Sequence, residues 1–194
     1  MERDVVIAHG ATSKPEEHWF PWLADQVRGA GYNAFVPRFP TPEGQDVPQW
    51  LAVLDSTLSP LGPSTTLVGH SLGSALMLRA LERPGPAVEA SVFVSGFAGA
   101  IGNEFFDSLN APFFVEPFDW QAIRQRTGKV RLFAGSDDPF VPLSKGEELA
   151  AHLGAELTVI PGGGHLISQY GYTEFQQLWD ALRLTWADEA VLAA

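Results

Sequence analysis

The 194-residue sequence contains no cysteine, and this absence rules out disulfides, thiolate metal sites and a cysteine nucleophile. Positive charge is also scarce, because 12 Lys and Arg stand against 23 Asp and Glu, a formal net charge of −11 at pH 7. A chain this acidic does not suit the phosphates of nucleic acid or an anionic membrane surface. We therefore expect neither nucleic acid nor a membrane as a partner.

Long apolar runs are missing as well. The opening residues MERDVVIAHG carry charges where a signal peptide is apolar. Their apolar run, VVIA, is far shorter than the ~20 residues that cross a bilayer. These features predict a cytoplasmic protein.

The length fits a single domain over residues 1–194, without repeats or a linker. Short runs rich in Val, Ile, Leu and Phe predict buried strands at Val5–Ala8, Ala34–Val36, Thr65–Val68, Ala90–Val94, Val130–Ala134 and Leu157–Ile160. Helical patterns lie between them, at Glu17–Arg28, Gln49–Leu58, Leu72–Arg83, Phe118–Arg126, Ser144–Leu153 and Thr173–Trp186. This alternation predicts an α/β fold with a mainly parallel sheet of about six strands and helices on both faces.

One pentapeptide, Gly69-His70-Ser71-Leu72-Gly73, matches G-x-S-x-G between a predicted strand and a predicted helix. In that setting the serine lies on a strained bend, and the glycines avoid collisions with the neighbouring strand and helix. The bend exposes the hydroxyl, and it places the Leu72 N–H at a helix start, where it can stabilise an oxyanion. The alternative is a turn that happens to contain a serine. The context favours Ser71 as a nucleophile.

A nucleophilic serine needs a histidine base and a carboxylate, in the chain order serine, acid, histidine on this kind of fold. Two acids, Asp137 and Asp138, directly follow the strand Val130–Ala134. Asp138 is favoured, because it holds the fourth place of G-x-x-D and is fixed by Pro139. Asp137 is then a turn or capping residue.

His165 is the expected base, because it follows the last predicted strand and three glycines that allow the loop to return to the site. A structural loop histidine is the alternative. The other histidines fit the part less well: His9, His18, His70 and His152.

A second oxyanion donor is expected from the loop after the first strand. We assign it to the N–H of Ala11, with Thr12 as the alternative, because the sequence leaves the register open. No His or acid pair has ligand spacing on one helix, so no metal is expected.

With these residues placed, the chain resembles the α/β-hydrolases, and within them the small serine hydrolases of the retinoblastoma-binding protein 9 and YdeN family. The resemblance covers nearly the whole chain. It is carried by HGATSKPEEHWFPWL, GHSLGS, FDWQAIRQ, GSDDPFVPLSKGEELAAHLGAEL and GGGHL.

The resemblance implies a triad of Ser71, Asp138 and His165 that works through a serine ester, without a metal or an organic cofactor. It implies esterase activity on a small-molecule acyl substrate and, in some relatives, peptidase or amidase activity. The animal namesake is linked to the retinoblastoma protein through L-x-C-x-E. This chain lacks cysteine and cannot carry that motif, so no such partner is expected.

The segment Phe97–Gly128 lies where these enzymes often insert a cap, and its length allows only a small one or none. Its aromatic residues either line an acyl site or, as we favour, mostly pack on the core. A small cap predicts short acyl groups. The rival hypotheses are an amidase or aminopeptidase on the same triad, and a non-catalytic binding protein on a hydrolase fold. No feature of the sequence indicates an oligomeric state.

Overall fold

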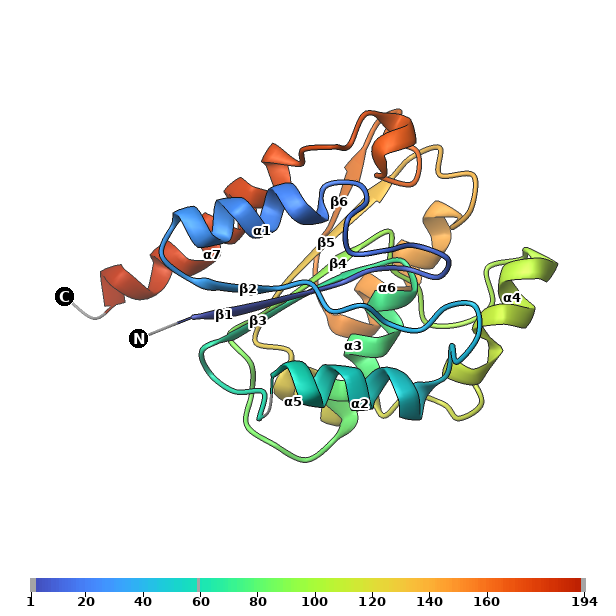
Figure 1. Ribbon diagram of the computed structural model, residues 1–194, viewed down its shortest axis with the longest axis horizontal. Coiled ribbons are helices and arrows are strands. Elements are labelled where there is room, and N and C mark those ends of the chain that lie inside the picture. Colours follow the sequence, from blue (N-terminus) through green and yellow to red (C-terminus); the bar gives the residue numbers. More distant parts are fainter. Residues whose placement is uncertain (1–2, 59, 193–194) are drawn as a thin grey trace.

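A computed structural model describes residues 3–58 and 60–192, with side chains through residue 187 (Figure 1). The described residues form a six-stranded sheet in the order β2-β1-β3-β4-β5-β6, and every pair of neighbours is parallel. The strands are β1 (Asp4–Ala8), β2 (Asn33–Phe35), β3 (Thr65–His70), β4 (Ala90–Val94), β5 (Lys129–Gly135) and β6 (Leu157–Ile160). The predicted α/β class and parallel sheet are confirmed.

Helices cover both faces of this sheet, because apolar residues on the strands alternate between two cores (Figure 1). On β1, Val5 and Ile7 contact one core, whereas Val6 and Ala8 contact the other. The first core is closed by α1 (Phe20–Gly29) and α7 (Gln176–Leu192). The second is closed by α2 (Val47–Thr57), α3 (Leu72–Glu82), α5 (Trp120–Arg126) and α6 (Leu143–Leu153).

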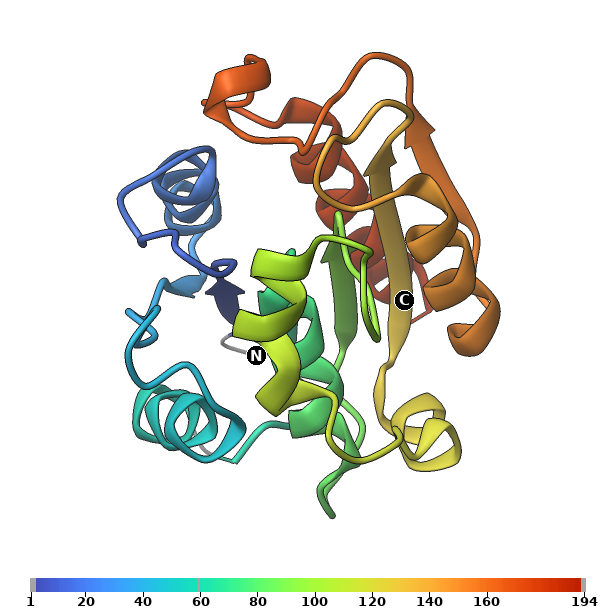
Figure 2. The ribbon, with the colours of Figure 1, turned by 90° about the vertical axis from the view of Figure 1, so that its right-hand side faces the viewer.

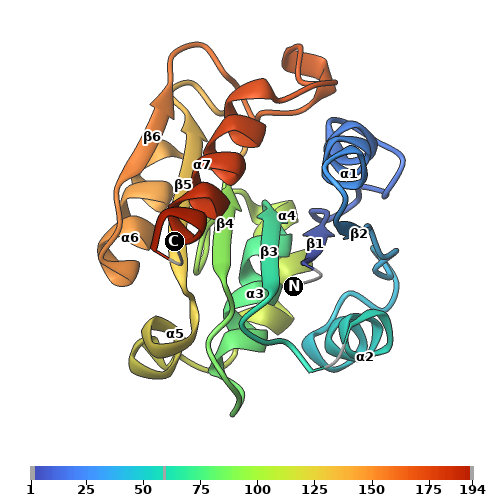
Figure 3. The ribbon, with the colours of Figure 1, turned by 90° about the vertical axis from the view of Figure 1, so that its left-hand side faces the viewer.

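The strand order places a crevice at the carboxyl end of the sheet. The chain runs from β1 outward to β2 and then crosses to β3 on the other side of β1. The loops that follow β1 and β3 therefore diverge, and such a switch point is where open α/β sheets bind ligands. Figure 2 looks onto this end of the sheet, with α4 (Glu104–Asn110) in front of it. Figure 3 shows the opposite end, where β1 begins and α7 ends.

Several helix boundaries differ from the expected ones. Helix α7 spans Gln176–Leu192 instead of Thr173–Trp186. Helix α1 begins at Phe20 instead of Glu17, because His18 has a positive φ of 56° and Pro21 lies in the first turn. Helix α4 was not predicted; it begins at Glu104 and is capped by Asn103, whose side chain accepts the N–H of Phe106.

The aromatic residues between Phe97 and Gly128 mostly pack on the core, as we expected. The packed residues are Phe97, Phe106, Phe113, Phe114, Phe118 and Trp120. Phe105 is the exception, since 64% of its surface is exposed. Within the described residues, no helix combines the length and apolarity that crossing a membrane requires.

Candidate active site

Ser71 lies on a strained bend between β3 and α3. Its backbone has φ 53° and ψ −121°, a conformation that L-residues rarely adopt. The bend is held by its own N–H, which donates to the Val94 carbonyl at 2.9 Å, and by the Ser74 N–H, which donates to the Ser71 carbonyl at 2.9 Å. The side chain of Ser71 lines a cavity at the carboxyl end of the sheet.

The two flanking glycines allow this bend, as the sequence pattern predicted. A methyl group on Gly69 would overlap with the side chain of Met77 and the backbone of Gly73 in α3. A methyl group on Gly73 would overlap with the Ala8 carbonyl in β1. The helix can therefore begin directly against the strand only if both positions lack a side chain.

His165 follows β6 and reaches the same cavity. Its Nδ1 lies 2.7 Å from Oδ2 of Asp138, whose side chain is 1% exposed. The other carboxylate oxygen of Asp138 accepts the backbone N–H groups of Phe140 and Val141, at 2.9 and 3.0 Å. A carboxylate so held accepts the Nδ1–H of His165, which leaves Nε2 of the imidazole as the basic nitrogen.

Asp137, the alternative acid, binds the backbone of residues 161–167, which we call the histidine loop, instead of the imidazole. Its side chain is exposed, and Oδ1 accepts the backbone N–H of Gly164 at 2.9 Å. Beside it, the Ser136 hydroxyl accepts the N–H of Gly162 at 3.2 Å. Asp137 thus anchors the backbone of the loop, and Asp138 binds the imidazole.

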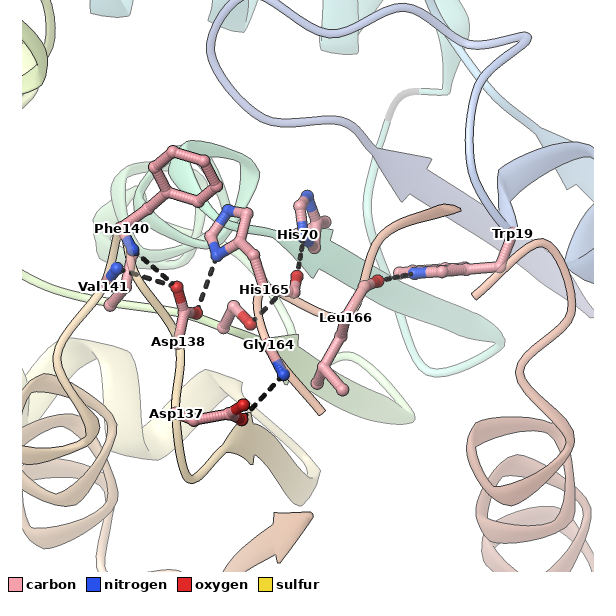
Figure 4. A network of polar contacts seen from close by, with 10 residues as sticks. Trp19, His70, Asp137, Asp138, Phe140, Val141, Gly164, His165 and Leu166 are labelled. Atoms are coloured by element: carbon pink, nitrogen blue, oxygen red, sulfur yellow. Dashed lines mark hydrogen bonds and ion pairs between the residues drawn. The ribbon is translucent and has the colours of Figure 1, made fainter. Parts of the chain in front are cut away.

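Three side chains donate hydrogen bonds to carbonyl groups of the same loop, and Figure 4 labels two of them, His70 and Trp19. The carbonyl of His165 accepts Nε2–H of His70 at 3.0 Å and the hydroxyl of Ser95 at 3.3 Å. The next carbonyl, that of Leu166, accepts Nε1–H of Trp19 at 2.9 Å. All three donors are buried, so the loop is fixed at its carbonyls as well as at its N–H groups.

His70, immediately before the serine, is a neutral buried ring. Because a carbonyl can only accept, the proton of His70 is on Nε2. Burial, and then the neighbouring His165, lower the pKa of His70 well below its usual value. Its Nδ1 is the one buried side-chain nitrogen or oxygen within the described residues that lacks a hydrogen-bond partner.

The loop after β1 brings Ala11 to the cavity that Ser71 lines. The N–H of Thr12 donates to Oγ1 of Thr41 at 2.8 Å. The N–H groups of Ala11 and Leu72 have no partner among the described residues. Gly10 brings the loop close, since a side chain there would come within 2.9 Å of the Ser71 Cβ.

His9 orients the N–H of Ala11. Its Nε2 accepts the N–H of Phe39 at 3.0 Å, so the proton is on Nδ1, which lies 2.8 Å from the Gly10 carbonyl. The N–H of a trans peptide points opposite to its carbonyl, so the N–H of Ala11 is turned away from His9. Burial lowers the pKa of His9 and favours this neutral form.

The cavity that these loops enclose measures about 240 Å³. Its apolar lining is provided by Phe97, Ile101, Phe106, Phe140, Val141 and Ile167. A polar wall comes from the loop after β1, namely Thr12, Ser13, Glu17 and His18. Backbone strain gathers at the same place, because every non-glycine residue with a positive φ in the described chain lines the cavity or adjoins the histidine loop: Thr12, His18, Ser71, Ser95 and Leu166.

Trp19, His18 and His70 form hydrogen bonds with the segment 165–168, and no pattern in the sequence predicts these bonds. Trp19 and Leu166 are 147 positions apart, and His70 and His165 are 95 apart. Contacts at such separations leave no local pattern. The run HWFPWL, at residues 18–23, was the only local indication of these contacts. It places a histidine and several aromatic residues in the segment that follows the first strand.

Comparisons with known proteins identify a family for the chain. The family model for serine hydrolases matches residues 5–184. The YdeN protein of Bacillus subtilis (strain 168) is 31% identical over 185 residues, 94% of this chain and 95% of that protein. Serine hydrolase RBBP9 of Rattus norvegicus is 25% identical over 175 residues, 90% of this chain and 89% of that protein.

The fold is similar to that of solved structures. The crystal structure of the ydeN gene product from B. subtilis superposes with a TM-score of 0.88 and covers 95% of this chain and 99% of that one. A structure described among carboxylesterases of the thaumarchaeon Nitrososphaera gargenis has a TM-score of 0.68 at 14% identity, covering 96% of this chain and 90% of that one. The second likeness concerns the fold alone.

Proposed function

The chain belongs to the serine hydrolase family, and from this premise we propose that it hydrolyses carboxylic esters with small acyl groups through Ser71, His165 and Asp138. The observation that carries the proposal is the 2.7 Å contact between His165 and Asp138, at a cavity that Ser71 also lines. A serine hydroxyl is a weak nucleophile, and a neutral imidazole held by a carboxylate is the partner that activates it.

In the proposed reaction, Ser71 Oγ attacks the ester carbonyl while Nε2 of His165 accepts the hydroxyl proton. Asp138 holds the imidazole by Nδ1 and stabilises the imidazolium that forms. His165 then delivers the proton to the leaving alcohol, and the acyl group remains on Ser71. A water molecule, deprotonated by His165, attacks this acyl-enzyme and releases the carboxylic acid.

The oxyanion of each tetrahedral intermediate is assigned to the N–H groups of Leu72 and Ala11. Neither has a hydrogen-bond partner among the described residues, and Leu72 is the first residue of α3, where the helix dipole favours negative charge. The alternative donor, Thr12, is disfavoured because its N–H is engaged by Thr41.

The preference for small acyl groups is supported by the size and lining of the cavity. A volume of about 240 Å³ lies below the roughly 300–1,000 Å³ of sites for drug-sized ligands. The lining from Phe97, Ile101 and Phe106 is apolar, which suits a short hydrocarbon chain. A long acyl chain would have to leave the cavity.

The test is the hydrolysis of p-nitrophenyl acetate, butyrate and octanoate by the wild type and by Ser71→Ala. We expect turnover of the two short esters, weaker turnover of the octanoate, and loss of all three in the variant. Matched p-nitroanilides measure the preference for esters over amides. If the folded wild type hydrolyses none of these compounds and a fluorophosphonate leaves Ser71 unlabelled, the proposal is wrong and a binding protein on a hydrolase fold takes its place.

A further inference from the structure

His18 occupies an unusual position in the polar wall of the cavity. It belongs to the loop between β1 and α1, its side chain is half-buried, and it lines the same cavity as Ser71 and His165. Its φ of 56° is unfavourable for a residue with a side chain. Strain of this kind persists where the surrounding structure requires it, and such positions cluster at functional sites.

The contacts of His18 determine which of its nitrogens carries the proton. The backbone N–H of Ser168 lies 3.3 Å from Nδ1, and the hydroxyl of the same residue lies 3.0 Å from it. A backbone N–H can only donate, so Nδ1 is the acceptor. The neutral ring therefore carries its proton on Nε2.

Nothing in the described chain uses that Nε2–H. The hydrogen bonds of His18 both involve Nδ1, and Nε2 is not sealed inside the protein. Burial, and to a smaller extent His165, lower the pKa of His18, so the ring stays a neutral donor in neutral solution. His18, a residue of the cavity wall, thus carries a side-chain N–H that no described residue accepts.

The neighbouring Glu17 restricts the chemical class of acceptor that can bind to this N–H. Oε2 of Glu17 accepts the hydroxyl of Ser13 and the N–H of Lys14, each at 3.0 Å, and Glu17 lines the cavity as well. A carboxylate on the same wall repels an anionic group placed next to His18. An uncharged oxygen acceptor carries no such penalty.

We infer that His18 is a substrate-binding residue whose Nε2–H recognises an uncharged oxygen, of ether, hydroxyl or carbonyl type, close to the scissile ester. The inference rests on the proposed function and adds the substrate class: small esters that carry one further oxygen outside the ester group. The apolar lining then holds the hydrocarbon part, and His18 selects esters by the extra oxygen. A neutral hydrogen bond of this kind changes specificity by about 3- to 10-fold.

The test uses pairs of esters that differ by one oxygen in place of one methylene. For the acyl side the pair is p-nitrophenyl methoxyacetate and p-nitrophenyl butyrate. For the alcohol side it is 2-methoxyethyl acetate and butyl acetate. The variants are His18→Gly and His18→Asn, because both residues tolerate a positive φ. His152→Asn, at an exposed position in α6, is the control.

The readout is the ratio of kcat/KM for the wild type to that for the variant, compared within each pair, so that intrinsic reactivities cancel. For His18→Gly we expect the loss on the oxygen-bearing ester to exceed the loss on its carbon counterpart by about 3- to 10-fold in one pair. The pair that responds identifies the side that faces His18. His18→Asn, which keeps an N–H donor, should retain part of the preference, and His152→Asn should retain all of it.

Equal losses within both pairs would overturn the inference and reduce His18 to a support for Ser168. That result would leave the proposed function intact, because turnover would still depend on Ser71. Absence of Ser71-dependent hydrolysis of every ester would instead reject the proposed function, and this inference with it.

Discussion

The carbonyl oxygen of His165 accepts a hydrogen bond from Nε2–H of His70 at 3.0 Å. His70 immediately precedes Ser71 in the chain, so one residue connects the bend that carries the serine to the loop that carries the histidine. The ring centroids of His70 and His165 lie 4.8 Å apart, and the rings pack edge to face. The position of His165 relative to Ser71 is therefore set by a direct bond between their two segments.

Replacement of this donor should slow the reaction without weakening substrate binding to the same degree. His70→Phe keeps a ring but leaves the His165 carbonyl with only the Ser95 hydroxyl. We expect kcat to fall roughly tenfold, since a misplaced base weakens the attack, with a smaller change in KM. Steady-state kinetics on p-nitrophenyl butyrate measure both values. An unchanged kcat in a folded variant would show that the bond does not position His165.

The neighbouring aspartates should differ sharply in their effects. Asp138→Asn loses the carboxylate that accepts Nδ1–H of His165 and should lower kcat by about four orders of magnitude. Asp137→Asn keeps an oxygen that can accept the N–H of Gly164, so its loss should stay below about tenfold. Each variant serves as the control for the other in the same assay. Similar losses, or the reverse order, would contradict the assignment of Asp138.

The glycines that flank Ser71 should contribute to the stability of the fold. Gly73→Ala brings a methyl group against the Ala8 carbonyl of β1, and we expect a loss of about 1–3 kcal/mol in the free energy of unfolding. Gly99→Ala is the matched control, because a methyl group there meets no atom within 4 Å. Urea unfolding followed by circular dichroism gives both values. Equal stabilities of the two variants would refute the packing argument.

Acid should destabilise the protein through the buried His9 and His70 and the half-buried His18. In the folded chain the pKa values of His9, His18 and His70 lie below 6.5, chiefly because burial disfavours the charged ring. Below pH 6.5 the unfolded chain therefore binds more protons than the folded one, and the free energy of unfolding falls as the pH falls.

His70→Phe removes one of these titrating groups and isolates its share. From about pH 7.5 to about pH 5.5, the variant should lose less stability than the wild type, as measured by urea unfolding at each pH. The difference between the two losses reports His70 alone, because the other groups are common to both proteins. Parallel losses would mean that His70 is not buried as a neutral ring.

Much of the fold could be predicted because its signals are local. Each strand is a short apolar run. The bend at Ser71 combines a run of this kind with G-x-S-x-G and the start of a helix. Helix α4 was missed because it is only seven residues long, and its start depends on the cap formed by Asn103. The early start expected for α1 failed because the strained backbone of His18 has no sequence signature.

Only those parts of the site could be predicted that follow from the order of residues in the chain and from the ends of the strands. These were enough to bring Ser71, Asp138 and His165 to one edge of the sheet. The choice between Ala11 and Thr12 depends on Thr41, which lies 29 residues beyond Thr12 and takes its N–H. The hold of Trp19 and His70 on the histidine loop likewise comes from tertiary contacts, which local patterns do not encode.

The most direct test of the central claim is to label the protein with a fluorophosphonate and locate the adduct by peptide mass spectrometry. The account predicts one adduct, on Ser71, that forms rapidly in the wild type, slowly in Asp138→Asn, and not at all in Ser71→Ala. The slow reaction of Asp138→Asn would show that the serine is activated through His165. An unlabelled Ser71 in the folded wild type, or an adduct on another serine, would contradict the account.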